Sequence, residues 1–471
     1  MNDQDFRDQA HGIVDWMADY LDTIERYPVR AAVGPGDIAA KLPETPPDDS
    51  HTIEAILGDF ERDILPGITH WQHPRFFAYF PANSSPPSVL AEMLTATIGA
   101  QCMLWQTSPA ATEMETRMLD WLRQMIGLPP GFTGVIQDSA SGATLVAILT
   151  AREKMLDWQS NEEGLFGQPP LAVYCSAETH SSIEKAATIA GLGRRHVRKI
   201  AVDGDGGMRP DALEAAIAAD QAAGIRPCCV VATIGSTGTG ASDPIRPLSE
   251  ICATHGVWLH VDAAWAGSAL ILEEHRHLAD GAEAADSFVF NPHKWLFTNF
   301  DCSAYFVRDE EALIRTFEIM PEYLKSREGR QVIDYRDWGI PLGRRFRALK
   351  LWFVIRAYGV DRLKAMIADH IAWTHRLAEA VRATPDFEIM TPPRLALFTF
   401  RYHPAGTNDG AALDALNARL LQRINDDGRI YLTQTLVDGT YVIRFAVGQR
   451  STELRHLDEA WKVIRDLAAG L

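Results

Sequence analysis

The sequence predicts an α/β fold in which a helical arm is followed by a large domain built on a mainly parallel β-sheet and then by a smaller α/β domain. Residues 1–85 carry helical patterns, residues 86–360 alternate short apolar runs with helical segments, and residues 361–471 mix helices with a few strands. Short runs that are apolar throughout are typical of parallel strands, because these are buried on both faces. We therefore expect three structural units with these boundaries.

The bulk composition favours a globular protein. The chain has 471 residues, of which 46% are hydrophobic and 23% are charged, so it can bury a large core. Its formal net charge of −17 opposes binding to nucleic acid. The first residues lack the basic start and apolar run of a secretion signal, and no segment has the length of a membrane span. We expect a cytoplasmic protein without a nucleic-acid or membrane partner.

The six cysteines show no CxxC spacing, and each lies in or beside an apolar run. This pattern suits buried thiols better than disulfides or a zinc site. We expect no metal ion.

The N-terminal arm consists of two helical patterns separated by prolines. Residues 6–24 place apolar side chains at helical spacing, and residues 53–64 repeat this pattern after the stretch KLPETPPDDSHT. A helix with one apolar face must bury that face against another surface. The arm is therefore not expected to fold alone.

The later elements follow in order. Apolar runs predict strands at 134–137, 171–174, 229–234, 258–261, 287–290 and 303–307. A long helical pattern through 344–359 precedes the last unit. That unit is predicted to contain a helix at 361–384, strands at 387–391, 395–402, 430–435 and 440–446, a turn at Asp438-Gly439, and a helix at 452–468.

A lysine follows one of these buried strands. In DSFVFNPHKW, the strand is followed by Asn291, His293 and Lys294. Ligands bind beyond the carboxyl ends of parallel strands, so Lys294 lies where a ligand is expected. Most lysines are solvated surface charges, but a desolvated lysine has a depressed pKa and can attack an aldehyde, as Schiff-base formation requires.

An aspartate ends the preceding strand. In WLHVDAAWAGS, Asp262 is followed by small residues that include Ala264. Taken alone, this segment fits a strand-end carboxylate that caps the next turn equally well. Beside Lys294, Asp262 is the candidate to pair with the pyridine nitrogen of pyridoxal 5′-phosphate (PLP), because a protonated ring is an electron sink.

Two turns are candidates for binding a phosphate group. Ser139, Ala140 and Ser141 lie between a strand and a helix, where hydroxyls, free N–H groups and the positive helix end would meet an anion. Thr237 lies in GSTGTG after another strand. Taken alone, the first turn is a weak signal, because such turns before helices are usually ordinary caps, and the second could be merely a flexible turn.

A histidine follows a further strand. His180 lies between a strand and a helix in LAVYCSAETHSS. A lone histidine is more often a hydrogen-bonded structural residue, but this side chain can also stack on a ring and transfer protons near neutral pH.

Taken together, the segments VIQDSAS, CSAETHSS, VATIGSTGTG, HVDAAWAGS, FNPHKW and IPLGRRFRALKLWF resemble the group II PLP-dependent decarboxylases, specifically the aromatic-L-amino-acid decarboxylase family. The resemblance extends from the N-terminal helix to about residue 360 and is looser beyond. It implies the aspartate-aminotransferase-like fold (PLP fold type I) with a seven-stranded sheet. It also implies a homodimer whose N-terminal arms wrap the partner subunit.

The resemblance assigns roles to matching positions. Lys294 would carry PLP as a Schiff base, Asp262 would pair with the pyridinium, and His180 would stack on the ring opposite Ala264. Further cofactor contacts would come from Ser139, Ala140, Ser141, Thr237, Asn291 and His293.

Tyr323 matches the tyrosine of the family's mobile catalytic loop, which helps to protonate the reacting carbon after carbon dioxide leaves. Relatives with phenylalanine there tend towards oxidative formation of an aldehyde. Tyr323 together with His180 therefore favours simple decarboxylation to an amine, although Tyr323 could also serve only to pack the loop.

The expected substrate pocket is aromatic and uncharged. Its candidates are Trp71, Tyr79, Phe80, Pro81, Ala82, Met103, Trp105, His180 and Gly343. Such aromatic residues also pack interfaces. Met103 and Ala82 replace the phenylalanine and threonine usual in animal relatives, and Gly343 matches the small residue of relatives that accept indole substrates. DOPA, tryptophan, 5-hydroxytryptophan, tyrosine and phenylalanine all remain candidate substrates.

Three alternatives stay open. The first is a decarboxylase of glutamate or diaminobutyrate, which would need a charged pocket residue that is not evident near residues 71–105. The second is an aldehyde synthase that releases hydrogen peroxide and ammonia. The third is a non-catalytic PLP-binding regulator, against which the presence of Lys294, Asp262, His180 and Tyr323 argues.

Overall fold

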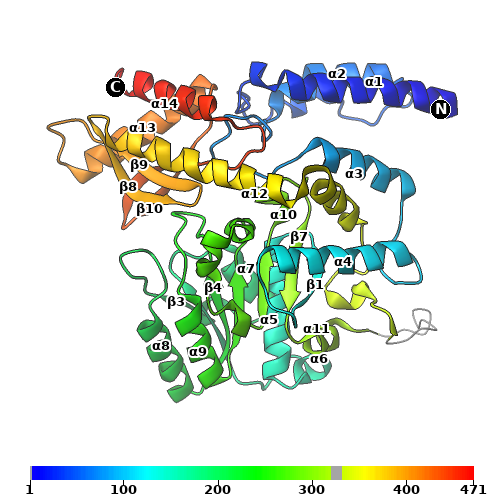
Figure 1. The fold of residues 1–471 in the computed structure, drawn as a ribbon, viewed down its shortest axis with the longest axis vertical. Helices are drawn as coiled ribbons and strands as arrows, with labels where there is room; N and C mark the ends of the chain where they lie inside the picture. Colours follow the sequence, from blue (N-terminus) through cyan, green and yellow to red (C-terminus); the bar gives the residue numbers. More distant parts are fainter. Residues whose placement is uncertain (1–2, 320–330) are drawn as a thin grey trace. The chain divides into compact units, whose positions relative to one another are not determined.

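The computed structural model describes residues 3–319 and 331–471, which group into two compact units (Figure 1). One unit contains residues 82–372 and 393–397, and the other contains residues 1–81, 373–392 and 398–471. The arm and most of the C-terminal part therefore belong to the same unit.

The larger unit, residues 82–372 and 393–397, is built on a seven-stranded sheet with the strand order β1-β7-β6-β5-β4-β2-β3. Its strands are β1 (Thr133–Gln137), β2 (Leu171–Ser176), β3 (Val197–Ile200), β4 (Arg226–Thr233), β5 (Trp258–Asp262), β6 (Ser287–Phe290) and β7 (Ser303–Val307). The pairs formed by β3, β2, β4, β5 and β6 are parallel, whereas β7 runs antiparallel to both β6 and β1. The mainly parallel seven-stranded sheet is confirmed.

The sequence does not predict a strand at the position of β3. Its segment, VRKI, is partly exposed at the edge of the sheet, and Arg198 and Lys199 interrupt its apolar character. An edge strand is covered on fewer sides, so its sequence carries a weaker apolar signal.

The helices of this unit are α3 (Pro86–Ile98), α4 (Pro109–Met125), α5 (Ala140–Met155), α6 (Gln159–Glu163), α7 (Ser182–Ile189), α8 (Pro210–Ala222), α9 (Ile245–His255), α10 (Pro292–Trp295) and α11 (Glu310–Phe317). A longer helix, α12 (Arg347–Arg382), has a non-helical residue at Gly359, where φ is 72°. Glycine adopts this left-handed conformation without the steric cost of a side chain. The two helical patterns expected on either side of residue 360 therefore meet at this break.

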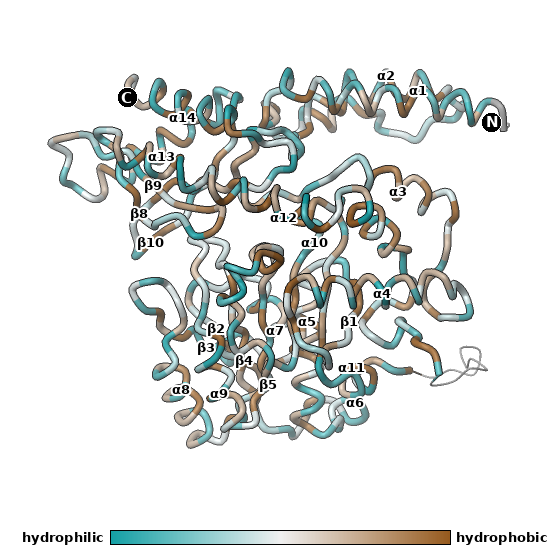
Figure 2. Tube along the Cα trace, in the orientation of Figure 1, coloured by the Kyte–Doolittle hydropathy of each residue, from teal (hydrophilic) through white to brown (hydrophobic). Residues whose placement is uncertain are grey.

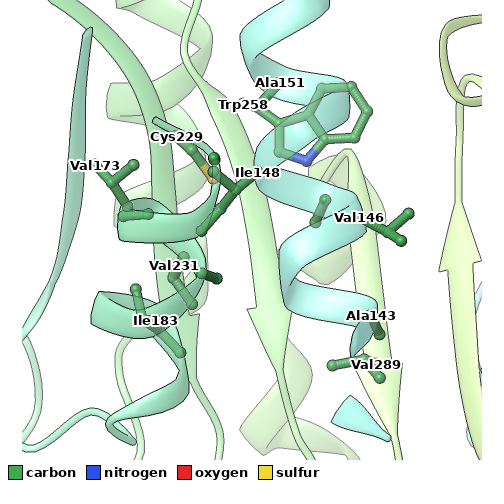
Figure 3. Close-up of a cluster of buried hydrophobic side chains, with 14 of the residues drawn as sticks. Ala143, Val146, Ile148, Ala151, Val173, Ile183, Cys229, Val231, Trp258 and Val289 are labelled. Carbon is green, nitrogen blue, oxygen red and sulfur yellow. The ribbon is translucent and has the colours of Figure 1, made fainter. Parts of the chain in front are cut away.

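The core of the larger unit lies between α5 and the sheet. Figure 3 shows Ala143, Val146, Ile148 and Ala151 of α5 beside side chains from β2, β4, β5 and β6. Small and branched residues on both sides allow helix and sheet to approach closely. This packing fixes the N-terminus of α5 at the edge of the sheet where β1 ends.

The smaller unit combines the arm with a four-stranded sheet of strand order β10-β11-β9-β8. Its elements are α1 (Asp3–Asp22), α2 (Ile53–Asp59), β8 (Phe387–Arg394), β9 (Leu397–Tyr402), α13 (Gly410–Asp427), β10 (Thr433–Val437), β11 (Thr440–Ala446) and α14 (Leu454–Ala468). Asp438 and Gly439 both have positive φ in the β10–β11 hairpin, which confirms the predicted turn. The strand expected at 430–435 starts later, at Thr433.

The arm has partners within the smaller unit. The Val29 N–H donates to the carbonyl of Gly428 over 2.8 Å, and Arg75 pairs with Glu459 at 2.9 Å. The arm therefore packs against the C-terminal residues of its own chain.

Figure 2 shows hydrophobic colouring along much of α3 and on the sheet strands. In the described part of the chain, no helix combines the length and apolar character needed to cross a membrane.

Candidate active site

Five loops that carry candidate residues leave the large sheet at one edge. The strands β2, β4, β5 and β6 are parallel, and β1 runs with them because it is antiparallel to β7, which is itself antiparallel to β6. The loops at 138–139, 177–181, 234–244, 263–265 and 291 therefore all start at the carboxyl ends of strands. Ligands bind at this edge in α/β sheets.

Lys294 lies in the short helix α10, just after β6. Asn83 holds this turn in place: its N–H donates to the carbonyl of His293 over 2.8 Å, and its side-chain amide donates to the carbonyl of Lys294 over 2.5 Å. Burial lowers the pKa of Lys294, while the nearby Asp262 carboxylate opposes this shift. A larger share of the amine is therefore neutral and nucleophilic than for an exposed lysine.

Asp262 ends β5 and is only 5% exposed. One carboxylate oxygen accepts the N–H of Ala264 over 3.0 Å. Burial raises the pKa of Asp262, whereas the Lys294 ammonium, this hydrogen bond and His180 all favour the ionised form. These electrostatic interactions indicate that Asp262, Lys294 and His180 lie near one another.

His180 precedes α7 and contacts solvent over part of its surface. Its Nδ1 lies 2.8 Å from the hydroxyl of Ser182 and accepts the N–H of Ser182 over 3.1 Å. Desolvation lowers the pKa of His180, with Asp262 opposing and Lys294 reinforcing the shift. The neutral form of the ring is therefore favoured over the imidazolium.

The N-terminus of α5 carries the first candidate phosphate turn. The Ser139 hydroxyl accepts the N–H of Gly142 over 3.1 Å and donates to Asp138 over 3.2 Å, so it caps the helix. Ser141 is exposed, and Ala140 is buried. The ordinary capping role and an anion-binding role are compatible, because other N–H groups of the first turn remain available.

The second candidate turn follows β4. Thr237 is exposed, whereas the neighbouring Ser236 is buried and accepts the N–H of Ala241 over 3.1 Å. The Trp265 indole donates to the carbonyl of Gly235 over 2.7 Å. Buried hydrogen bonds of Ser236 and Trp265 therefore stabilise the loop, while Thr237 is exposed.

Asn291 and His293 are buried supports of the Lys294 turn. The Asn291 side chain accepts the Ser303 hydroxyl over 2.6 Å, and the Asn291 N–H donates to the carbonyl of Ala264 over 2.9 Å. His293 accepts the Cys302 N–H over 2.9 Å, and burial lowers the pKa of His293 to about 3. Neither interaction requires a bound molecule.

Four predicted substrate residues belong to the smaller unit. The rings of Trp71 and Tyr79 stack with centroids 5.7 Å apart, and both side chains are exposed. Phe80 and Pro81 are buried and lie so close to Gly448 that a Cβ there would be 2.7 Å from the Phe80 ring.

The other predicted substrate residues belong to the larger unit. Ala82 and Met103 are half-buried, and Gly343 lines a cavity of about 440 Å³ with Gln101 and Arg344. A Cβ at Gly343 would lie 3.3 Å from the side-chain nitrogen of Gln101. Trp105 lines a different cavity of about 520 Å³. Tyr323 lies outside the described residues.

Several residues that support the site were missed by sequence reasoning. The Thr179 and Thr233 hydroxyls lie 2.9 Å apart, which joins the His180 loop to the end of β4. Asp243 accepts the N–H groups of Thr233 and Met208, each over 2.7 Å. Asp243 stands out in the sequence as a carboxylate just beyond a strand-end turn, but the pairing of Thr179 with Thr233 leaves no local pattern.

The donor set fits PLP. A partly buried lysine of lowered pKa suits an aldehyde, and a buried carboxylate close enough to interact with it suits the ring nitrogen. The first turn of α5, at the same sheet edge, presents N–H groups and hydroxyls that suit a phosphate.

Comparisons with known proteins agree with this donor set. The family model for the pyridoxal-dependent decarboxylase conserved domain matches residues 35–403. The chain is 42% identical to phenylacetaldehyde synthase of Arabidopsis thaliana (100% of this chain, 97% of the relative) and 41% identical to tyrosine decarboxylase of Papaver somniferum (99% and 95%). The crystal structure of Oryza sativa TDC with PLP and tryptamine superposes with a TM-score of 0.97 at 37% identity (100% and 99%). The chain therefore belongs to the pyridoxal-dependent decarboxylase family and uses PLP as its cofactor.

Proposed function

We propose that the protein decarboxylates aromatic L-amino acids to arylalkylamines and carbon dioxide. The observation that carries this proposal is the interaction of the buried Asp262 carboxylate with the partly buried Lys294 amine at the carboxyl edge of the sheet. The substrate class is supported by the similarity to tyrosine decarboxylase of Papaver somniferum and to tryptophan decarboxylase 2 of rice. It is also supported by the similarity to the crystal structure of Oryza sativa TDC with PLP and tryptamine.

The residues at this edge of the sheet would have different roles in the reaction. Lys294 would bind the cofactor covalently through its amine, and the Asp262 carboxylate would hold a proton at the ring nitrogen. When bound, PLP supplies an electron-withdrawing ring that accepts the electron pair left on the α-carbon as carbon dioxide departs. His180 would stack on one face of the ring, and Ala264 would leave room on the other.

The remaining cofactor contacts orient rather than react. The first turn of α5, through Ser139, Ala140 and Ser141, would hold the phosphate together with Thr237. Asn291 and His293 would keep the Lys294 turn in position through the hydrogen bonds described above. Tyr323 would return a proton to the α-carbon.

Substrate choice would depend on the ring-binding residues. We propose that Trp71, Tyr79, Phe80, Pro81, Ala82, Met103, His180 and Gly343 contact the substrate. Gly343 and Gln101 line a cavity of about 440 Å³, which supports acceptance of an indole as well as a phenyl ring.

A second candidate activity is supported by one observation, the similarity to the Arabidopsis phenylacetaldehyde synthase. In that case the same site would convert the amino acid, molecular oxygen and water to an aldehyde, with release of carbon dioxide, ammonia and hydrogen peroxide. The resemblance at Tyr323 favours the amine-forming reaction.

We also propose a cytoplasmic homodimer. The cytoplasmic location is supported by the six cysteines, which are all free and buried thiols. The dimer is supported by exposed apolar residues on α3, namely Leu90, Leu94 and Ile98.

One assay separates these activities. The holoenzyme is incubated with L-DOPA, tryptophan, 5-hydroxytryptophan, tyrosine, phenylalanine and glutamate, and carbon dioxide, amine and hydrogen peroxide are quantified with Lys294→Ala as control. We expect amine and carbon dioxide in equal amounts from at least one aromatic substrate, and none from the control. Peroxide equal to carbon dioxide would identify an aldehyde synthase, and turnover of glutamate alone would overturn the aromatic assignment.

A further inference from the structure

The helix α7 has an unusual N-terminal cap. A helix leaves its first N–H groups without partners inside the helix, and a side chain usually accepts one of them. The residue at the N-cap position, Ser181, makes no such bond with its side chain. Instead, the imidazole of His180 accepts the N–H of Ser182, the first residue of the helix, over 3.1 Å.

This hydrogen bond defines where the proton of His180 lies. A backbone N–H can only donate, so Nδ1 must be the accepting nitrogen and carries no proton. A neutral ring then has its proton on Nε2, on the other side of the imidazole. The Ser182 hydroxyl lies 2.8 Å from the same Nδ1, and with an acceptor facing it the hydroxyl acts as a second donor.

We propose that Ser182 is a positioning residue that holds His180 as a neutral imidazole with its proton on Nε2. The geometry of this proposal stands on contacts within the 180–182 turn, while its catalytic meaning rests on the proposed function. Nothing in the sequence pattern separates Ser182 from Ser181, because both follow His180.

The surroundings of the ring are consistent with a neutral form. The carboxylate of Asp262 and the ammonium of Lys294 act on His180 in opposite directions, and desolvation lowers its pKa. Glu184, in the first turn of α7, pairs with Arg194 at 3.3 Å. The Thr179–Thr233 hydroxyl contact holds the backbone that precedes the ring.

The position of the proton on His180 determines which hydrogen bonds the ring can make. A neutral imidazole with a proton on Nε2 can donate a hydrogen bond to an anionic substrate group, whereas an imidazolium would place a second cation beside Lys294. Protonation at Nδ1 would also break the hydrogen bond from Ser182 and bring two donors together. Ser182 therefore helps to set the lowest pH at which His180 is in its working form.

The direct test measures the pKa of His180 itself. Hydrogen–deuterium exchange at the imidazole C2 position, followed by peptide mass spectrometry, reports this pKa in the full-length protein with and without PLP. We expect Ser182→Ala to raise the pKa of His180 by about 0.7 unit, because the variant loses one hydrogen bond of about 1 kcal/mol to the neutral ring. Ser182→Thr keeps the hydroxyl and should retain the wild-type value, and His375 in α12 is an internal control.

The outcomes are distinct. An unchanged or lowered pKa of His180 in Ser182→Ala would overturn the proposal, since the hydroxyl would then make no contribution or would accept a hydrogen bond from a protonated ring.

The acid limb of the kcat/KM pH profile should shift upwards by the same amount in Ser182→Ala and return to the wild-type position in Ser182→Thr. An acid limb that stays in place while the pKa moves would reject the link to catalysis. Exchange needs no turnover, so an inactive protein would refute the proposed function without affecting the test of Ser182.

Discussion

The protonation states of the buried Asp262 and the partly buried Lys294 influence each other. Burial alone favours a neutral carboxyl and a neutral amine, while their mutual attraction favours the ionised forms. The hydrogen bond from Ala264 adds to the ionised form of Asp262. The protonation of each group therefore depends on the presence of the other.

Replacing the carboxylate separates function from folding. Asp262→Asn keeps an oxygen for the Ala264 N–H but removes the charge that would hold a proton on the cofactor ring. We expect kcat to fall on the order of 100-fold or more, the scale of a lost electrostatic contact in an active site. The unfolding temperature of the apoprotein should not fall, because a buried charge is removed.

The matched control is Asp286→Asn. Burial raises the pKa of Asp286 as well, but this residue precedes β6, at the opposite edge of the sheet. Its kcat should stay at the wild-type value. Equal losses in kcat for the two variants would mean that Asp262 acts only through the fold.

Asp243 should give the stability of the protein a specific pH dependence. Burial raises the pKa of Asp243 from 3.8 to about 6, so ionisation of this carboxyl costs more in the folded state than in the unfolded state. Its contribution is fully present below about pH 4 and is lost as the pH rises through about 6, by about 3 kcal/mol in total.

The measurement is urea unfolding between pH 4.5 and 7.5. Asp243→Asn has no carboxyl to ionise, so its free energy of unfolding should decline less over this range than that of the wild type. Only the pH slopes are compared, because the amide also places a donor against the N–H groups of Thr233 and Met208. Identical slopes would contradict the assignment.

At the scale of elements, α5 serves both the core and the site. Its apolar side chains pack on the sheet, and its first turn opens at the carboxyl edge of the strands. The same packing therefore fixes the position of the N–H groups proposed to bind phosphate. Ser139 caps this helix, whereas Ser141, two residues later, makes no hydrogen bond with its side chain to the described residues.

Two matched variants distinguish the cap from the phosphate contact. Ser139→Ala should lower the free energy of unfolding of the apoprotein by about 1 kcal/mol, the usual cost of a lost N-cap. Ser141→Ala should leave this free energy unchanged. Both should weaken binding of PLP, measured by titration of the apoprotein. Full PLP affinity in Ser141→Ala would remove Ser141 from the phosphate site.

At the scale of the molecule, one face of α3 is left exposed by the residues that the structure describes. Leu90, Leu94 and Ile98 recur every four residues on α3 and are 52%, 46% and 61% exposed. This spacing places them on one face. A contiguous apolar face of this kind normally marks an interface, and the proposed occupant is a second copy of the chain.

Introducing charge on this face should disrupt the dimer. Leu94→Glu is expected to shift the protein from dimer to monomer in sedimentation equilibrium at micromolar concentration, because burial of an unpaired carboxylate is costly. Leu436→Glu, at a 59% exposed position of the β10–β11 hairpin, is the control and should remain dimeric. A monomeric wild-type protein would refute the dimer, and a dimeric Leu94→Glu would place the interface elsewhere.

The amount of the fold that could be predicted varied with burial. Strands covered on both faces, such as β4 and β5, are apolar throughout and were predicted, while the edge strand β3 carries Arg198 and Lys199 and was not. The long helix α12 was predicted as two segments because Gly359 interrupts its pattern. Local composition thus predicts strands and helices that are well buried, but it predicts the edge strands of a sheet poorly.

The sequence by itself determined which residues are candidates for the chemistry of the site. Lys294, Asp262 and His180 each follow an apolar strand, and parallel strands bring their ends together, so order along the chain was enough to group them. Only the tertiary structure decided which groups hold them in place. Asn83 reaches Lys294 across 211 residues of sequence, and Thr179 reaches Thr233 across 54. Such hydrogen bonds depend on the packing of distant segments, and no local periodicity records them.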